Sequence, residues 1–400
     1  MNEERRGSLK TASDGDETFN FDGVFRDVND KNTRVKLYSA QASVKDGKWT
    51  EAETILNETI KSLSEGHDQR NLKLVLREIE RYQKFHIAMA SPAVSGINWI
   101  DVCERKPEMY FEKFDELPQS IFTLKNWRLA ENVLVGRRLL SHQWIANKIR
   151  ELHCSHVRAG MLLGVLVDQR VQEDGILVYY YPLTAKEKRF YMHDVVSNHL
   201  RDIELVFPFP PLQSIMKTEI HCPDEGWEID EKLALQLGEG EVFLREYSVK
   251  FLKSLGREDL FLFDPACSTG QFLSTMKAGL PNCFTFGQDL SSCMVKYAKN
   301  RVDEARCANA LDPQVPDETA DVEFVRFINS EVVKAKEARI MIEPLLKPLK
   351  TGGYMITFGH TPVLVSAADF KMSGRFEIMQ CVGGDPEWDG IFQYYVCKKI

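Results

Sequence analysis

The stretch from Leu260 to Phe272, LFLFDPACSTGQF, decides the fold of this chain. Its apolar first part predicts a buried strand that ends at Asp264, and its small residues predict a turn into a helix. In open α/β sheets, such a turn points backbone N–H groups and a helix N-terminus at a nucleotide. A second predicted strand, Cys283–Gln288, is followed by Asp289, roughly 20 residues after the turn, where a carboxylate can hold a ribose diol. The C-terminal half is therefore predicted to bind a nucleoside.

Strands and helices alternate through this half of the chain. Strands are expected at 260–263, 283–288, 305–307, 321–327, 354–358, 375–382 and 391–398, and helices at 230–254, 270–278, 291–302 and 330–349. Alternation of this kind predicts βαβ crossovers and a parallel sheet. The last two strands are joined without room for a helix, so they are expected to close the sheet as an antiparallel hairpin.

The N-terminal half has a different pattern. Residues 1–35 are polar and are expected to form a flexible arm, and residues 36–210 are expected to form a mostly helical accessory domain with a β-hairpin at 161–167 and 175–181. Its expected helices are 48–64, 71–89, 117–130, 135–158 and 185–200. The proline-rich stretch Phe207–Pro211 cannot continue a helix, and it predicts a boundary before a second domain at 211–400.

Composition limits the classes of function. The chain has 400 residues, which suits two domains, and a formal net charge of −8 with no basic tract, which argues against a nucleic-acid partner. No apolar run is long enough to span a bilayer, and no apolar segment follows the charged N-terminus, so neither a membrane anchor nor a secretory signal is expected. Nine cysteines without a CxxC pair indicate reduced thiols and a cytoplasmic protein.

Residues 225–400 resemble class I S-adenosylmethionine-dependent methyltransferases. The resemblance rests on four segments in the family's order, which are Asp264–Gly270, Gly287–Ser291 with Met294, Asn309–Asp312 and Leu346–Tyr354. It implies an α/β fold with a seven-stranded Rossmann-like sheet that ends in an antiparallel hairpin. It also implies S-adenosylmethionine as the cofactor and a methyl acceptor as the second substrate.

The resemblance implies roles for individual residues. Asp264 would orient the turn and approach the methionine amino group, and Asp289 would accept both ribose hydroxyls. The other implied cofactor contacts come from the first turn, the adenine pocket and the end of the fourth strand: Ala266, Cys267, Ser268, Gly270, Phe272, Leu290, Met294, Asn309, Ala310, Arg326 and Phe327. His360 is a candidate catalytic base. Tyr179, Tyr181, Tyr191 and His193 are candidates for an acceptor pocket.

Departures from the family pattern limit the classes of methyl acceptor that are expected. The first turn keeps only Gly270 of the usual alternating glycines, and Arg326-Phe327-Ile328-Asn329 stands where adenine methyltransferases carry an Asn/Asp-Pro-Pro-aromatic tetrapeptide. The expected acceptor is therefore a small molecule, such as a specialised metabolite or an amino-acid derivative. A homodimer that forms through the N-terminal domain is a separate expectation. A protein side chain remains an alternative acceptor.

Other interpretations compete with this one. Asp264 and Asp289 could each simply cap the following helix. A nicotinamide dehydrogenase would require a full Gly-x-Gly-x-x-Gly turn, which is missing. A non-catalytic subunit could keep the same fold. The spacing of His153, Cys154 and His156 matches no standard zinc pattern, so no metal site is expected.

Overall fold

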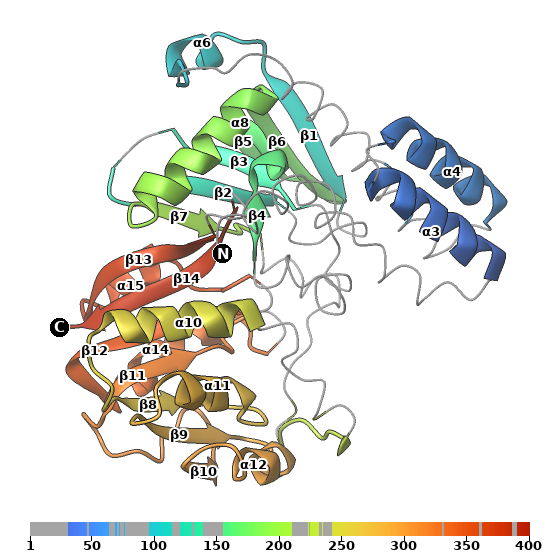
Figure 1. Ribbon diagram of the computed structural model, residues 1–400. Helices are drawn as coiled ribbons and strands as arrows, with labels where there is room; N and C mark the ends of the chain where they lie inside the picture. Colours follow the sequence, from blue (N-terminus) through green and yellow to red (C-terminus); the bar gives the residue numbers. More distant parts are fainter. Residues whose placement is uncertain are drawn as a thin grey trace, which may run out of the picture.

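The computed structural model describes residues 31–45, 48–63, 69, 72, 76, 96–113, 121–129, 132–138, 155–209, 223, 225–231, 234, 242–329, 332–359, 362–385 and 390–400. Two sheets dominate this part of the chain (Figure 1). None of its helices is both long and apolar enough to cross a membrane.

The C-terminal sheet has the strand order β10-β9-β8-β11-β12-β14-β13. Its parallel strands are β8 (Phe261–Asp264), β9 (Phe284–Asp289), β10 (Glu304–Cys307), β11 (Ala320–Val325) and β12 (Leu349–Thr357). The antiparallel hairpin of β13 (Phe376–Asp385) and β14 (Gly390–Lys399) closes the sheet as predicted. Strand order reverses between β8 and β11, and in open α/β sheets ligands bind in a crevice beyond the carboxyl ends of the strands at such a point.

Helices cover both faces of this sheet, because its central strands are buried on both sides. Side chains of α10 (Val242–Ser254), α11 (Gln271–Gly279) and α12 (Ser292–Ala298) pack in one apolar cluster with Leu262, Val322 and Ile356. Side chains of α13 (Ala335–Ile340), α14 (Ile342–Leu345) and α15 (Ala367–Met372) pack in another cluster with Val325 and Met355. The result is an α/β fold with a mixed sheet between two helical layers.

The described part of the N-terminal half is dominated by a second sheet, so the prediction of a mostly helical domain is wrong there. All of its pairings are antiparallel, in the order β1-β6-β5-β3-β2-β7. The strands are β1 (Glu108–Lys113), β2 (Ile121–Asn126), β3 (Leu134–Arg137), β5 (Leu162–Val171), β6 (Gly175–Pro182) and β7 (Ile203–Val206). The predicted hairpin is β5–β6. Strand β2 lies where a helix was expected over 117–130, and β3 overlaps the start of the helix expected over 135–158, of which residues 139–154 lie outside the described residues.

The helices of this half flank the sheet (Figure 1). They are α3 (Lys31–Lys45), α4 (Trp49–Ser62), α6 (Trp99–Cys103) and α8 (Ala185–Asp194), and α8 continues as a π-helix over Val195–His199. A capping box starts α8, because Thr184 and Glu187 each accept a backbone hydrogen bond of the other. The helix predicted over 48–64 is α4, but its partner in the observed hairpin is α3, which overlaps the expected arm. Most of the helix expected over 71–89 lies outside the described residues.

The two halves are joined by a short strand that the sequence did not predict. Strand β4 (Val157–Arg158) pairs antiparallel with Gly390–Ile391 of β14 and gives the C-terminal sheet eight strands rather than seven. Next to it, the backbone N–H of Gln393 donates to Ser155 Oγ at 2.9 Å, and the Gln393 amide donates to the Leu205 carbonyl at 3.0 Å. The N-terminal half therefore adds a strand to the C-terminal sheet next to the first residues of β14.

One buried acid gives the fold a testable pH dependence. The Glu323 side chain on β11 is fully buried and neither carboxyl oxygen has a hydrogen-bond partner among the described residues, and burial raises its pKa well above the usual value. A group whose pKa is raised in the folded state contributes its full stability to the fold at pH values below its unfolded-state pKa. That contribution is lost as pH rises from the unfolded-state pKa toward the folded-state pKa. We therefore expect Glu323→Gln to gain stability over the parent chain by up to about 1.4 kcal/mol between pH 5.5 and 6.5 in urea titrations. A constant difference across this range would contradict the assignment.

Candidate nucleoside site

The turn after β8 is held by Asp264, whose side chain is completely buried. Its Oδ1 accepts the backbone N–H of Ala266 at 3.1 Å, so the carboxylate closes the turn on itself. Ser268 and Gly270 adopt left-handed backbone conformations, with φ of 53° and 77°. Gly270 then begins α11 as its N-cap without a side-chain hydrogen bond, so Asp264 is not the helix cap. The turn therefore has the small-residue geometry predicted from the sequence.

Asp289 ties this turn to the end of β9. Its Oδ2 accepts the Ser268 N–H at 2.8 Å, and its Oδ1 accepts the Ser291 N–H at 2.9 Å. Burial raises the pKa of Asp289 above its ordinary value, and the backbone hydrogen bonds partly offset that shift. Ser291 caps α12 through the Met294 N–H at 3.2 Å, so Asp289 is not needed as a cap. A carboxylate with two backbone donors still has acceptor lone pairs for a ligand diol.

Arg326 links the two strands on either side of the crevice. Its Nε lies 2.8 Å from Asp264 Oδ2, and its guanidinium lies 4.7 Å from the centroid of the Phe272 ring. The Arg326 side chain is only 10% exposed. The family resemblance implied cofactor contacts for both Asp264 and Arg326, but their ion pair was not predicted. The pair places one negative and one positive group at the same point of the crevice.

The turn and β9 approach each other closely at Gly287. A Cβ at this position would lie 2.7 Å from Cys267 Sγ and 2.8 Å from Cys267 Cβ, and the Cys267 N–H donates to the Gln288 carbonyl at 2.8 Å. Burial, together with Asp264 and Asp289, raises the pKa of Cys267 well above its usual value. The thiol is therefore protonated at physiological pH, and with 1% exposure Cys267 packs between the turn and β9 and leaves little side-chain surface for a ligand.

Replacing this glycine should disturb the turn. We expect Gly287→Ala to lower the free energy of unfolding by about 1–2 kcal/mol and to weaken nucleoside binding, because the new methyl group forces Cys267 and its turn to move. Gly256→Ala is the control for affinity, since a Cβ there meets nothing within 4 Å and its φ of 70° strains only the backbone, outside the Cys267 turn. Thermal unfolding and titration with the nucleoside check both effects. Equal effects of the two substitutions on nucleoside affinity would contradict the close approach.

The predicted adenine contacts lie on neighbouring segments. Met294 is nearly buried, and its Sδ lies 3.6 Å from Ser268 Oγ, below the turn, while Leu290 is half-buried. Asn309 is exposed, and its Oδ1 accepts the Leu311 N–H at 2.9 Å. Ala310 is half-buried and packs against the apolar cluster of α13 to α15. These residues surround the Asp289 end of the site.

Some predicted residues have little surface to offer a ligand. Phe272 is 1% exposed and packs in the core, with ring centroids 4.9 Å from Phe324 and 5.5 Å from Phe358. Phe327 is 7% exposed. Ala266, by contrast, is half-buried. Phe272 therefore supports Arg326 from below rather than facing the crevice.

The predicted acceptor residues are not brought together. His360 lies outside the described residues. The ring of Tyr179 lies under the Arg170 guanidinium, 5.6 Å away, and His193 is exposed on α8. Tyr181 and Tyr191 both pack against the core of the N-terminal half, and only Tyr191 also lines a cavity there.

A segment for which no site role was predicted borders the site. Residues 225–231 cross the start of α12, where Ser291 Oγ donates to the Trp227 carbonyl at 2.5 Å. Cys293 Sγ lies 3.3 Å from the Ile229 carbonyl, and a Cβ on Gly226 would lie 2.6 Å from Ser291 N. Gly226 adopts φ of 81° at this close approach, and the glycine itself is the feature of the sequence that could have indicated it.

The fold and the paired turns define an α/β enzyme that binds a nucleoside cofactor at the switch point of its sheet. Residues 263–357 match the family model described as a methyltransferase domain. Over 249 residues the chain is 35% identical to isonocardicin synthase of Nocardia uniformis subsp. tsuyamanensis. The aligned region covers 62% of this chain and 80% of that protein. The chain belongs to the class I S-adenosylmethionine-dependent methyltransferases, and its cofactor is S-adenosylmethionine.

Solved structures show more distant likenesses. An S-adenosylmethionine-dependent methyltransferase from Aquifex aeolicus is 15% identical, with a TM-score of 0.32, and covers 42% of this chain and 99% of that chain. The sugar N-methyltransferase KedS8 from Streptoalloteichus sp. ATCC 53650 is 17% identical, with a TM-score of 0.27, and covers 33% of this chain and 55% of that chain.

The site fits this cofactor in its charges and in its shape. The methionine part of S-adenosylmethionine is a zwitterion, and Arg326, the more exposed member of the pair at 10%, offers a positive charge for its carboxylate. The Asp264 side chain is 0% exposed, so it acts by holding Arg326 and the turn in place. The turn from Ala266 to Gly270 lacks bulky exposed side chains, so a ligand can approach its backbone. Asp289 supplies the acceptor for a diol at the neighbouring strand.

Proposed function

We propose that this enzyme transfers the methyl group of S-adenosylmethionine to an amino-acid-derived small molecule. Asp289 holds the ribose, and the Asp264–Arg326 pair holds the methionine end. The observation that carries the cofactor part is the Asp289 carboxylate, which joins the ends of two adjacent parallel strands through Ser268 and Ser291. The relative whose name is isonocardicin synthase supports a small-molecule product.

The chemistry requires little acid–base work from the chain. When bound, the sulfonium supplies an activated methyl group, so the enzyme mainly aligns the acceptor with it and excludes water. Arg326 fixes the Asp264 carboxylate, and the stacked Phe272 limits the movement of its guanidinium. A base is needed only if the acceptor must lose a proton on transfer.

The acceptor class is inferred from β4. Because β14 runs antiparallel to β12, its first residues lie beyond the carboxyl ends of the parallel strands, and β4 pairs with them there. His156, just before β4, is 4% exposed, and its Nδ1 has no hydrogen-bond partner among the described residues. Burial and the nearby Arg158 and Arg138 guanidiniums lower the pKa of His156 well below its usual value. Arg138 and Arg158 are 3% and 7% exposed, so their positive charge favours an acceptor that carries a carboxylate through the local field rather than through direct contact.

Product analysis tests this function. The purified protein is incubated with S-adenosylmethionine and a panel of amino-acid-derived carboxylic acids, their methyl esters and a peptide mixture, and products are identified by mass spectrometry. We expect a free carboxylic acid to gain about 14 daltons and S-adenosylhomocysteine to form in equal amount. Preference for esters or peptides would overturn the acceptor class. A different mass gain without S-adenosylhomocysteine would show that another carbon on the sulfonium is transferred.

A further inference from the structure

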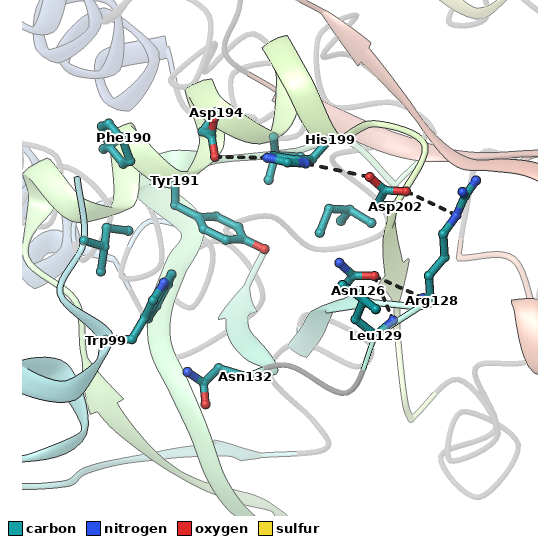
Figure 2. Close-up of a pocket in the computed structure, with 13 residues that line it drawn as sticks. Trp99, Asn126, Arg128, Leu129, Asn132, Phe190, Tyr191, Asp194, His199 and Asp202 are labelled. Atoms are coloured by element: carbon teal, nitrogen blue, oxygen red, sulfur yellow. Dashed lines mark hydrogen bonds and ion pairs between the residues drawn. The ribbon is translucent and has the colours of Figure 1, made fainter. Parts of the chain in front are cut away.

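A large cavity lies in the N-terminal half, away from the residues that form the nucleoside site. Its volume is ≈ 980 Å³, which is within the range of small-molecule pockets. Figure 2 shows side chains from several elements around it; the lining consists of Ile97, Trp99, Asn126, Arg128, Leu129, Asn132, Phe190, Tyr191, Asp194, Val195, His199, Asp202 and Ile203. None of these residues falls within the 263–357 methyltransferase match. Figure 1 shows α8 and β7, which carry several of these residues, beside the N-terminal sheet, away from β8, β9 and α11, which carry the cofactor turns.

One side of the cavity is aromatic. Trp99 and Tyr191 meet edge to face, with ring centroids 6.0 Å apart and an interplanar angle of 86°. Phe190 precedes Tyr191 on α8 and is 39% exposed, which is unusual for a phenylalanine of a folded core. Rings in this arrangement offer faces to a flat apolar group or to a cation.

The other side carries a chain of charged groups. The imidazole of His199 lies between two carboxylates, with Nε2 3.5 Å from Asp194 and Nδ1 3.7 Å from Asp202. Asp202 also pairs with Arg128 at 3.2 Å (Figure 2). Apart from the imidazole, two carboxylates and one guanidinium line this side of the cavity, so carboxylates outnumber the fixed cation by one. Arg128 pairs with Asp202, so the carboxylate without a guanidinium partner among these groups is Asp194, whose Oδ1 accepts a hydrogen bond from the Asn198 amide at 2.8 Å.

The backbone brings these groups together through an uncommon element. The helix α8 ends in the π-helix Val195–His199, directly after Asp194. The wider turn changes the direction of the side chains that follow it, and π-helices of this kind often occur at functional sites. Asp194 and His199 consequently lie on the same side of the helix and face the cavity (Figure 2).

We propose that this cavity is a second binding site, for an organic ammonium compound with an apolar, flat body. The ammonium group would bind at Asp194, and the body would lie against Trp99, Tyr191 and Phe190. The charge favours a cation over an anion, and the aromatic wall is complementary to both parts of such a ligand. This inference stands apart from the proposed acceptor, which carries a carboxylate and binds at the C-terminal sheet.

Calorimetric titration at pH 8 tests the proposal with 2-phenylethylamine as the probe and with the neutral 2-phenylethanol and the anion 3-phenylpropanoate as comparisons. We expect the amine to bind with a millimolar dissociation constant and at least about tenfold more tightly than either comparison compound. Saturating S-adenosylhomocysteine should leave that affinity unchanged. Equal binding of the three compounds, no binding of the amine, or competition with S-adenosylhomocysteine would each overturn the proposal.

Matched variants locate the bound amine. Asp194→Asn should weaken amine binding at least about fivefold, since the carboxylate charge is lost while a side-chain oxygen remains. Asp168→Asn is the control, because Asp168 is similarly exposed and pairs with Arg170 outside the cavity. Trp99→Leu should weaken binding of the amine without changing the cofactor affinity. The same loss in the Asp168 variant as in the Asp194 variant would show that the amine binds elsewhere.

Discussion

Replacing Asp289 with alanine is expected to weaken binding of S-adenosylhomocysteine by about 2–3 kcal/mol, roughly 30- to 150-fold. The carboxylate accepts the N–H groups of Ser268 and Ser291 and is proposed to accept the ribose hydroxyls as well. Its loss removes the ligand contacts and also releases the turn that lies against the cofactor. Isothermal titration calorimetry measures the change, and the fold is checked by circular dichroism.

The control acts on the other end of the same strand. Asp303 accepts the Thr285 N–H at 2.8 Å and pairs with Lys277 at 3.0 Å near the start of β9. Asp303→Asn should therefore lower the melting temperature but leave the affinity for S-adenosylhomocysteine unchanged. An unchanged affinity of the Asp289→Ala variant would mean that Asp289 has only a structural role.

Replacing Glu204 with alanine is expected to lower the free energy of unfolding by about 2–4 kcal/mol. This side chain is 0% exposed and connects the two halves of the protein. Its Oε1 accepts the Ala367 N–H at 2.7 Å and the Tyr395 hydroxyl at 3.0 Å. Its Oε2 forms an ion pair with Lys125 at 3.1 Å, although it lacks a hydrogen bond among the described residues. Alanine would leave two buried donors without their acceptor.

Two variants separate these contributions in denaturant titrations. Glu204→Gln keeps an oxygen for the buried donors and should cost less than alanine, and Tyr395→Phe should cost about 1 kcal/mol because it removes a single hydrogen bond. If alanine and glutamine at position 204 destabilise the protein equally, the hydrogen bonds to Ala367 and Tyr395 are not what holds the halves together.

The C-terminal fold could be predicted because its signals are local. Strand β8 is an apolar run that ends in Asp264, and β9 is a short strand with two phenylalanines that ends in Asp289. Each is followed by small residues that start a helix. The partner of Asp264 could not be predicted, since Arg326 is 62 residues away and either residue alone is also typical of a helix cap or a surface ion pair. Only the strand order brings β8 and β11 together.

The N-terminal sheet was missed for a different reason. The first four residues of β2 are all buried, so the alternation of apolar and polar residues that marks a half-exposed strand is absent. Strand β3 has only four residues, which is too short to show a period. The hairpin β5–β6 was found because a polar link separates two clear apolar runs. Recognition of a strand from the sequence therefore depended on how the fold buries it, and that burial cannot be read from the sequence.

A crystal structure with S-adenosylhomocysteine tests the central claim most directly. We predict that the adenosine lies over the turn from Ala266 to Gly270, with both ribose hydroxyls within hydrogen-bond distance of Asp289. The homocysteine end should contact the Asp264–Arg326 pair. Ligand density away from this turn, or a ribose held by residues other than Asp289, would contradict the account.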